Sequence, residues 1–212
     1  MLINFDFDGV IADTFDQLLA ICIAAQASIA EGRVPIKRDL QTLENLTFEG
    51  LADCLEIPPK AVPEFLQTVF GLQQTEQGTV HFFPKMAALL KSLSQSSDIA
   101  IITSSSADLV HGYLLEHGVS EAVSSICCGE TGRSKKDSIL ANIEQFSVSP
   151  KQTCMVGDAI SDIRQGKAAG IMTIAVGWGF HDRELLLRET PDYLTDSPGE
   201  LLEILGCFAE GL

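Results

Sequence analysis

The sequence "LINFDFDGVIADT" (residues 2–14) places two aspartates directly after a short apolar run. Residues 2–5 are mostly apolar, which is typical of a strand buried on both faces of a parallel sheet. Asp6 and Asp8 follow with one phenylalanine between them, and Gly9 comes next. Two acids beside a glycine at the end of such a strand have no evident structural purpose, so we expect a functional site there.

Short apolar runs alternate with helical patterns along the C-terminal part of the chain. Segments with helical spacing lie between these runs, and glycines follow several of them as expected of helix C-termini. The alternation predicts an α/β fold with a doubly wound, mostly parallel sheet. The further strands are expected at residues 99–103, 123–127, 153–157, 172–177 and, more weakly, 192–195.

The interval between the first and second strands has a different pattern. Residues 15–80 read as helices, with breaks at Pro35, Pro58 and Pro59. We therefore expect two domains: a core made of residues 1–14 and 81–212, and a small helical insertion made of residues 15–80.

The composition limits the partners. The net charge of −15 argues against nucleic-acid binding, because phosphate backbones attract basic surfaces. No apolar run approaches the ~20 residues that a membrane helix needs. The first residues carry aspartates in place of a basic leader, and the six cysteines lack zinc-type or CxxC spacing, so we expect a cytoplasmic protein with free thiols.

Polar side chains follow the predicted strands where each one ends. In open α/β sheets, ligands bind beyond the carboxyl ends of the strands, so these side chains are expected to converge. The candidates are Asp6 and Asp8 after the first strand, Thr103 and Ser104 after the second, Lys135 and Lys136 before a helix, and Asp158 and Asp162 after the fourth strand.

This set of side chains favours a magnesium ion and a phosphate. Two carboxylates about 4 Å apart repel by about 4 kcal/mol at an effective dielectric near 20, so the cluster needs a cation or raised pKa values. An all-oxygen set suits Mg²⁺, which leaves coordination positions for a substrate phosphate. The Thr103 hydroxyl, the backbone N–H groups of residues 103–105 and a lysine suit that phosphate.

Four motifs together resemble those of the haloacid dehalogenase-like hydrolase superfamily. They are "FDFDGVIADT" (5–14), "IAIITSS" (99–105), the lysine before "DSILANI" (137–143), and "VGDAISDI" (156–163) with "AAG" after it. The final stretch, from residue 175 on, resembles the phosphoglycolate phosphatase-like branch. The resemblance implies a Rossmann-like core and makes the helical insertion a cap domain.

The resemblance also implies catalytic roles for the acids. Asp6 is the expected nucleophile, which forms an aspartyl-phosphate, and Asp8 is the expected general acid and base. Mg²⁺ is expected on the Asp6 carboxylate, the Asp8 backbone carbonyl and Asp158. Asp162 is expected to orient the metal's waters or the lysine.

The remaining motif positions imply contacts with the phosphoryl group. Thr103 and the backbone at Ser104 are expected to bind it, and Gly9 is expected to allow a sharp turn that presents N–H groups. A lysine completes the set. Its spacing to the apolar pair Ile139-Leu140 favours Lys136 over Lys135.

The expected activity is Mg²⁺-dependent hydrolysis of a small organic phosphomonoester, similar to phosphoglycolate. A phosphomutase shares every one of these core residues and stays open as an alternative. So does a non-catalytic module that binds a phosphorylated ligand or a partner protein. The expected partner is a small phosphorylated metabolite, with specificity contacts from cap cations. Candidates for those contacts are Arg33, Lys37, Arg38 and Lys60.

Overall fold

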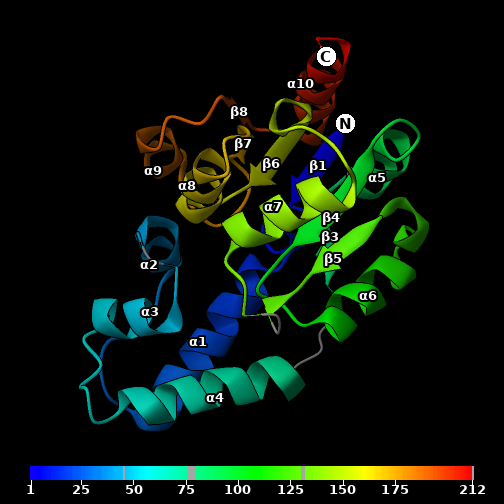
Figure 1. The fold of residues 1–212 in the computed structure, drawn as a ribbon. Coiled ribbons are helices and arrows are strands. Elements are labelled where there is room, and N and C mark those ends of the chain that lie inside the picture. Colours follow the sequence, from blue (N-terminus) through cyan, green and yellow to red (C-terminus); the bar gives the residue numbers. More distant parts are fainter. Residues whose placement is uncertain (45, 76–79, 130–131, 212) are drawn as a thin grey trace.

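A six-stranded sheet forms the centre of the molecule in the computed structural model, which describes residues 1–44, 46–75, 80–129 and 132–211. The strand order is β5-β4-β1-β6-β7-β8, and every neighbouring pair is parallel (Figure 1). This sheet confirms the predicted α/β fold class. The strands are β1 (Leu2–Phe5), β4 (Asp98–Ile102), β5 (Ser125–Cys127), β6 (Thr153–Gly157), β7 (Met172–Val176) and β8 (Tyr193–Thr195).

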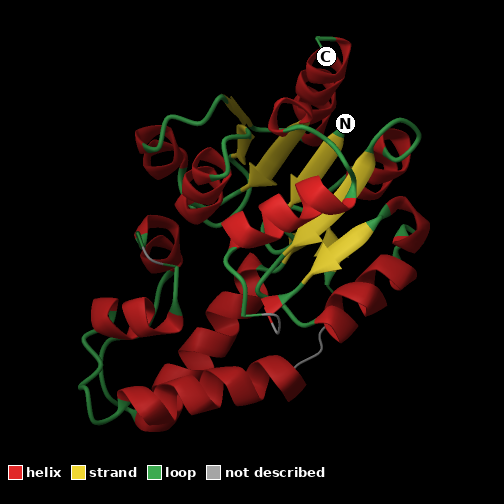
Figure 2. Cartoon of the chain, in the orientation of Figure 1, coloured by secondary structure: helices red, strands yellow, loops and turns green. Residues whose placement is uncertain are grey.

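Helices cover both faces of the sheet, as Figure 2 shows. Alternate side chains of β6 explain the two layers: Cys154 and Val156 join an apolar cluster with α5, α6 and α10, whereas Met155 packs on the other face with Ile139 of α7 and Ala169 after α8. These helices are α5 (Met86–Leu93), α6 (Ala107–Glu116), α7 (Lys135–Gln145), α8 (Ile160–Ala168) and α10 (Pro198–Glu210). The shorter α9 (Arg183–Arg188) packs on α8, and the 3₁₀ turns η1 (Ser120–Ala122) and η3 (Pro150–Gln152) precede β5 and β6.

The register of the central strands determines where the first motif ends. Phe5 at the end of β1 pairs with Ile101 of β4 and Val156 of β6. The Asp6 N–H continues the ladder by donating to the Val156 carbonyl at 2.9 Å. Residues just beyond β1, β4 and β6 therefore meet at one edge of the sheet, as expected for parallel strands.

The helical insertion lies beyond this edge (Figure 1). Its helices are α1 (Phe15–Ile29), α2 (Lys37–Thr42), α3 (Phe48–Cys54) and α4 (Val62–Thr75), and they enclose an apolar cluster that includes Ile21, Leu51 and Phe65. A short antiparallel pair, β2 (Ala12–Asp13) with β3 (His81–Phe82), joins the two ends of the insertion; it was not anticipated from the sequence. Residues 76–79, at the end of the expected insertion, lie outside the described residues.

Two further observations concern the chain as a whole. Among the described residues, no helix is both long enough and apolar enough to cross a membrane. The six cysteines are all free, and Cys22, Cys128 and Cys154 are buried. Free cysteines agree with the expectation from their spacing.

Candidate functional site

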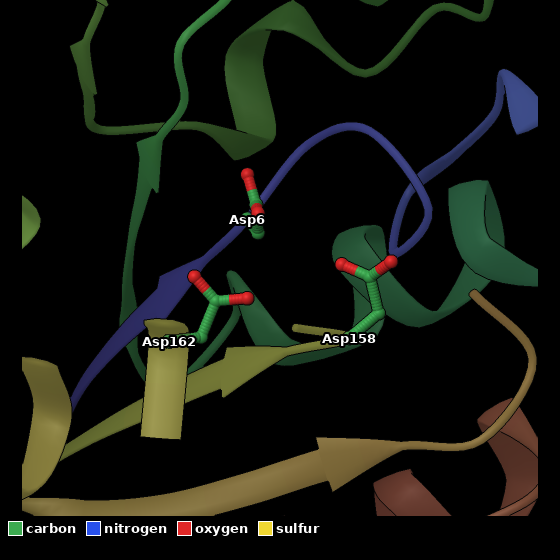
Figure 3. Close-up of side chains that lie close together, drawn as sticks. All are labelled: Asp6, Asp158 and Asp162. Atoms are coloured by element: carbon green, nitrogen blue, oxygen red, sulfur yellow. The ribbon is translucent and has the colours of Figure 1, made fainter. Parts of the chain in front are cut away.

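Three carboxylates converge at the carboxyl edge of the sheet. Asp6 follows β1, Asp158 follows β6, and Asp162 lies in the first turn of α8. One oxygen of each lies within 4.8 Å of the others (Figure 3). The parallel pairing of β1 with β6 brings Asp6 and Asp158 together, as expected from the sequence.

Lys135 is the cation of this cluster. Its Nζ donates to Asp6 Oδ2 and to Asp162 Oδ1, each at 2.5 Å. The expectation that Lys136 would take this place was wrong. Lys136 contributes its backbone N–H to Gln165 Oε1 at 3.2 Å, and no side-chain contact of Lys136 with the acids is seen in the described part of the chain.

The helical periodicity explains the correction. The inward face of α7 carries Ile139, which is 0% exposed, whereas Leu140 is 42% exposed. Residues four apart share a helix face, so Lys135 lies with Ile139 and Lys136 lies with Leu140. Only the lysine that shares a helix face with the inward-pointing residue can reach the acids. Since Ile139 points inward and Leu140 does not, that lysine is Lys135.

Both carboxylate oxygens of Asp6 have partners, and Oδ2 is the one that accepts from Lys135. Its side chain is nearly buried, and its Oδ1 accepts the Phe7 N–H at 2.7 Å. Burial raises the pKa of Asp6 to about 7, against the opposing effect of the Lys135 ammonium. The charged carboxylate that a nucleophile requires therefore depends on additional positive charge nearby.

Asp8 faces the turn after β4. Ser105 Oγ donates to Asp8 Oδ2 at 2.6 Å, and Thr103 Oγ1 lies 3.5 Å from the same oxygen. The Ser105 N–H in turn donates to Thr103 Oγ1 at 3.0 Å. Ser104 is exposed, with its carbonyl packed against Gly129. The hydroxyl that meets Asp8 most closely is thus that of Ser105, which the sequence reasoning did not single out.

Asp158, like Asp162, is only 1% exposed. Its Oδ2 accepts the Phe180 N–H at 2.6 Å. Burial raises the pKa of Asp158, and the charges of Asp6 and Asp162 raise it further. Phe180 was also not anticipated, because a backbone N–H donor leaves no signature in the residue type.

Glycines allow the chain to approach Asp158 closely. Gly9 has φ +76°, and a Cβ there would lie 2.1 Å from Asp158 Oδ2. A Cβ at Gly179 would lie 2.3 Å from the same oxygen. The Gly9 N–H donates to the Ala12 carbonyl at 2.8 Å and closes the turn. Glycine is therefore required at position 9 for two reasons: the backbone bends there, and it passes close to the Asp158 carboxylate.

The cluster fits a divalent cation. Asp6, Asp158 and Asp162 bring three carboxyl groups together with one ammonium, so the buried site has excess negative charge once all three are ionised. Its donors are all oxygens, which Mg²⁺ prefers, and Asp162 Oδ2 is already engaged by the Ala159 N–H at 3.0 Å. Asp6 and Asp158 are the side chains best placed to hold the ion.

The cationic side chains of the helical insertion that were proposed from the sequence are largely engaged with neighbouring acids. Arg33 makes a bidentate pair with Asp39, with distances of 2.6 and 2.7 Å. Lys60 pairs with Glu31 at 3.0 Å. These two pairs hold parts of the insertion together. Similarly, Lys37 Nζ lies 3.4 Å from Asp16 and 4.8 Å from the centre of the Phe15 ring, and Arg38 is exposed on α2.

Comparison with known proteins gives matches over nearly the whole chain. Residues 3–176 match the family model described as haloacid dehalogenase-like hydrolase. The phosphoglycolate phosphatases of Synechococcus elongatus and Vibrio cholerae are each 28% identical to the chain; the alignments cover 95% of both chains for the former and 96% for the latter. A solved haloacid dehalogenase-like hydrolase from Streptococcus pneumoniae has a TM-score of 0.81 at 20% identity, covering 96% of this chain and 97% of that one.

Proposed function

The chain belongs to the haloacid dehalogenase-like hydrolase family, and on this basis we propose that it is a Mg²⁺-dependent phosphatase acting on a small organic phosphomonoester. The family match confirms the resemblance drawn from the four sequence motifs. The observation that carries the proposal is the clustering of Asp6, Asp158 and Asp162 within 4.8 Å of one another, with the Lys135 ammonium bound to Asp6 and with Asp8 two residues further along the chain. That arrangement supplies a nucleophile, positive charge and a general acid within one site.

In the proposed reaction, the Asp6 carboxylate attacks phosphorus in line with the leaving oxygen. A bond forms between an Asp6 oxygen and phosphorus, the bond from phosphorus to the leaving oxygen breaks, and protonated Asp8 gives its proton to that oxygen. Asp8 then takes a proton from water, whose oxygen attacks phosphorus. The bond to Asp6 breaks, inorganic phosphate leaves, and Asp6 is restored.

Other residues hold the phosphoryl group and the acids in place. Lys135 neutralises phosphoryl oxygens as charge develops, and Thr103 donates a hydrogen bond to them. The hydrogen bond from Ser105 keeps the Asp8 carboxylate turned toward the leaving oxygen. Asp6, Asp158 and the Asp8 carbonyl would hold Mg²⁺, which would supply positive charge to offset the repulsion between an anionic substrate and the anionic nucleophile.

The helical insertion is proposed to act as the cap. We assign residues 1–14 and 81–212 to the core domain and residues 15–80 to the cap domain. The separate apolar cluster within α1–α4 supports this division. The insertion lies beyond the carboxyl edge of the sheet, where a cap can exclude water and contact the leaving group (Figure 1).

The relatives suggest the substrate class. Proteins named phosphoglycolate phosphatase cover nearly the full chain at 28% identity, so a small phosphorylated acid is the first substrate to examine. The free state of all six cysteines supports a reducing, cytoplasmic location.

Hydrolysis of an aryl phosphate, measured with and without Mg²⁺, tests the proposal. Activity must require the ion and disappear in Asp6→Asn, while Asp16→Asn, a change of an exposed carboxylate on α1, must leave activity intact. Binding of phosphate without any turnover by the native chain would favour the binding-module alternative. Isomerisation of a hexose phosphate in the presence of a bisphosphate activator would favour the mutase.

A further inference from the structure

The segment of residues 178–182, between β7 and α9, contacts both the acidic site and the helical insertion. On the site side, the Phe180 N–H donates to Asp158 Oδ2 at 2.6 Å. On the insertion side, the Asp182 N–H donates to the Gln41 carbonyl of α2 at 3.0 Å. Two backbone N–H groups, two residues apart, therefore connect the carboxylate of the site with the insertion.

The core fixes this segment closely around Asp158. The His181 N–H donates to the Asp158 carbonyl at 3.3 Å, and the buried His181 ring accepts the Ile160 N–H through Nδ1 at 2.9 Å. A side-chain Cβ at Gly179 would lie 2.3 Å from Asp158 Oδ2, so the backbone runs directly against the carboxylate. The orientation of Asp158 thus depends on where residues 179–181 lie.

The Phe180 side chain packs into the helical insertion. It is 4% exposed and packs in the apolar cluster formed by α1, α3 and α4. Its ring centroid lies 5.0 Å from that of Phe15, the first residue of α1. One residue therefore has its N–H on a carboxylate of the site and its ring in the core of the insertion.

We propose that Phe180 is a positioning residue that links the orientation of the Asp158 carboxylate to the packing of the helical insertion. The proposal rests on the proposed function, in which Asp158 is a ligand of the metal ion. A hydrogen bond weakens steeply as its angle departs from linearity, and tightly packed interiors transmit small displacements. Loss of the ring contact with α1 therefore turns the N–H away from Oδ2 and leaves Asp158 misaligned for the ion.

Calorimetric titration with MgCl₂ tests this link in Phe180→Leu, in Phe15→Leu and in the double variant. Each single variant is expected to weaken Mg²⁺ binding about tenfold, the effect typical of residues that orient a metal ligand. The double variant is expected to be no weaker than the weaker single variant, because both changes remove the same contact. Saturating Mg²⁺ restores kcat with an aryl phosphate, since the catalytic groups are intact.

Phe48→Leu is the matched control. The Phe48 ring packs edge-on against Phe70 at 5.5 Å within the insertion, in an aromatic pair of its own. This change lowers thermal stability through the loss of a ring, as the other changes do, and is expected to leave Mg²⁺ affinity unaltered. If Phe180→Leu fails to fold, Phe15→Leu decides the matter, because it leaves residues 178–182 unchanged.

The outcomes separate this inference from the proposed function. Native Mg²⁺ affinity in Phe15→Leu and Phe180→Leu would overturn the inference alone, as would an equal loss of affinity in Phe48→Leu. Failure of the native protein to bind Mg²⁺ would overturn the inference and the proposed function together.

Discussion

At the residue scale, one ammonium group is shared by two carboxylates at the centre of the site. Lys135 contacts Asp6 and Asp162, while Asp158 is held by a backbone N–H. The buried charges are therefore only partly balanced by the protein. Burial is the main cause of the raised pKa values of Asp6 and Asp158, and the charges of the neighbouring acids raise them further.

Substituting the two adjacent lysines separates their roles. Lys135→Ala removes the charge that faces Asp6 and the phosphoryl group, so we expect kcat to fall roughly 10²- to 10³-fold. Lys136→Ala leaves its backbone bond to Gln165 in place, and we expect kcat to stay near the native value. Steady-state kinetics with an aryl phosphate measures both, and a similar loss in the two variants would contradict the assignment.

The pH dependence of stability reports the burial of Asp6. The folded protein keeps the Asp6 proton up to about pH 7, whereas the unfolded chain releases it near 3.8. The free energy of unfolding of the metal-free protein should therefore fall as the pH rises through this interval. Thermal unfolding with a chelator should show this decline, and Asp6→Asn should reduce it.

The effect of Mg²⁺ on thermal stability at different pH values also tests the raised pKa of Asp6. The ion binds the charged carboxylates, so it should raise the Tm more at pH 8 than at pH 5. A native protein whose stability in chelator declines no more steeply than that of Asp6→Asn would contradict the raised pKa of Asp6.

The positions of the acids at the site could be predicted from the sequence, but not all the groups that contact them. Asp6 and Asp158 could be placed because they end strands whose parallel pairing was predictable. Lys136 was favoured over Lys135 because both of the adjacent lysines remain candidates until the inward face of the helix is known. Phe180 contributes a backbone N–H, which no residue type reveals.

At the element scale, the strand ends and the loops that follow them pack closely against one another. The backbone at Gly9 and the backbone at Gly179 both run against the Asp158 side chain. This proximity lets the loop after β7 support the first motif: Trp178 Nε1 donates to the Val10 carbonyl at 3.2 Å. The site is therefore built by three chain segments that pack on one another.

Gly179→Ala tests that packing. The added Cβ would lie 2.3 Å from the Asp158 Cβ and 2.5 Å from the Gly9 carbonyl oxygen, so the backbone has to move. We expect weaker Mg²⁺ binding and a loss of stability of about 1–3 kcal/mol, the usual cost of overpacking. Chemical denaturation and calorimetry measure these effects.

Gly199→Ala is the control for Gly179→Ala. A Cβ at Gly199 would lie 3.9 Å from Ser197 Oγ, an ordinary van der Waals distance, within the first turn of α10. Native stability and Mg²⁺ affinity are expected for this variant. Equal behaviour of the two alanine variants would show that the approach to Asp158 is not tight.

The main strands were predictable because their apolar runs are compact, and the observed bounds differ from the expected ones by at most two residues. The β2–β3 pair was not predictable, since each strand has only two residues and gives no pattern. Its partners are far apart in the sequence and meet only because the insertion returns to the core. Long-range closure of this kind is a property of the folded chain.

At the scale of the whole molecule, separate apolar clusters lie in the core and in the helical insertion. The largest cluster joins the central strands to α5, α6 and α10, and another lies within α1–α4. Phe180 is the residue of the loop after β7 that enters the second cluster. This arrangement underlies the proposed division into core and cap.

Hydrogen exchange in two alanine variants tests the division. Phe65 and Leu90 are both fully buried, the former in α4 and the latter in α5. We expect each alanine variant to lose about 2–5 kcal/mol of local stability. Phe65→Ala should speed amide exchange in α1–α4 and spare β1, β4 and β6, whereas Leu90→Ala should affect the strands. If amide exchange were accelerated uniformly along the chain in both variants, the division into a core and a cap would be contradicted.

The most direct test of the account is a crystal structure of the native protein soaked with Mg²⁺ and tetrafluoroaluminate. The account predicts the aluminium in line with an Asp6 oxygen, a magnesium ion between Asp6 and Asp158, and the Lys135 ammonium on a fluoride. A structure in which the analogue binds away from Asp6, or in which Asp6 and Asp158 share no ion at saturating Mg²⁺, would contradict it.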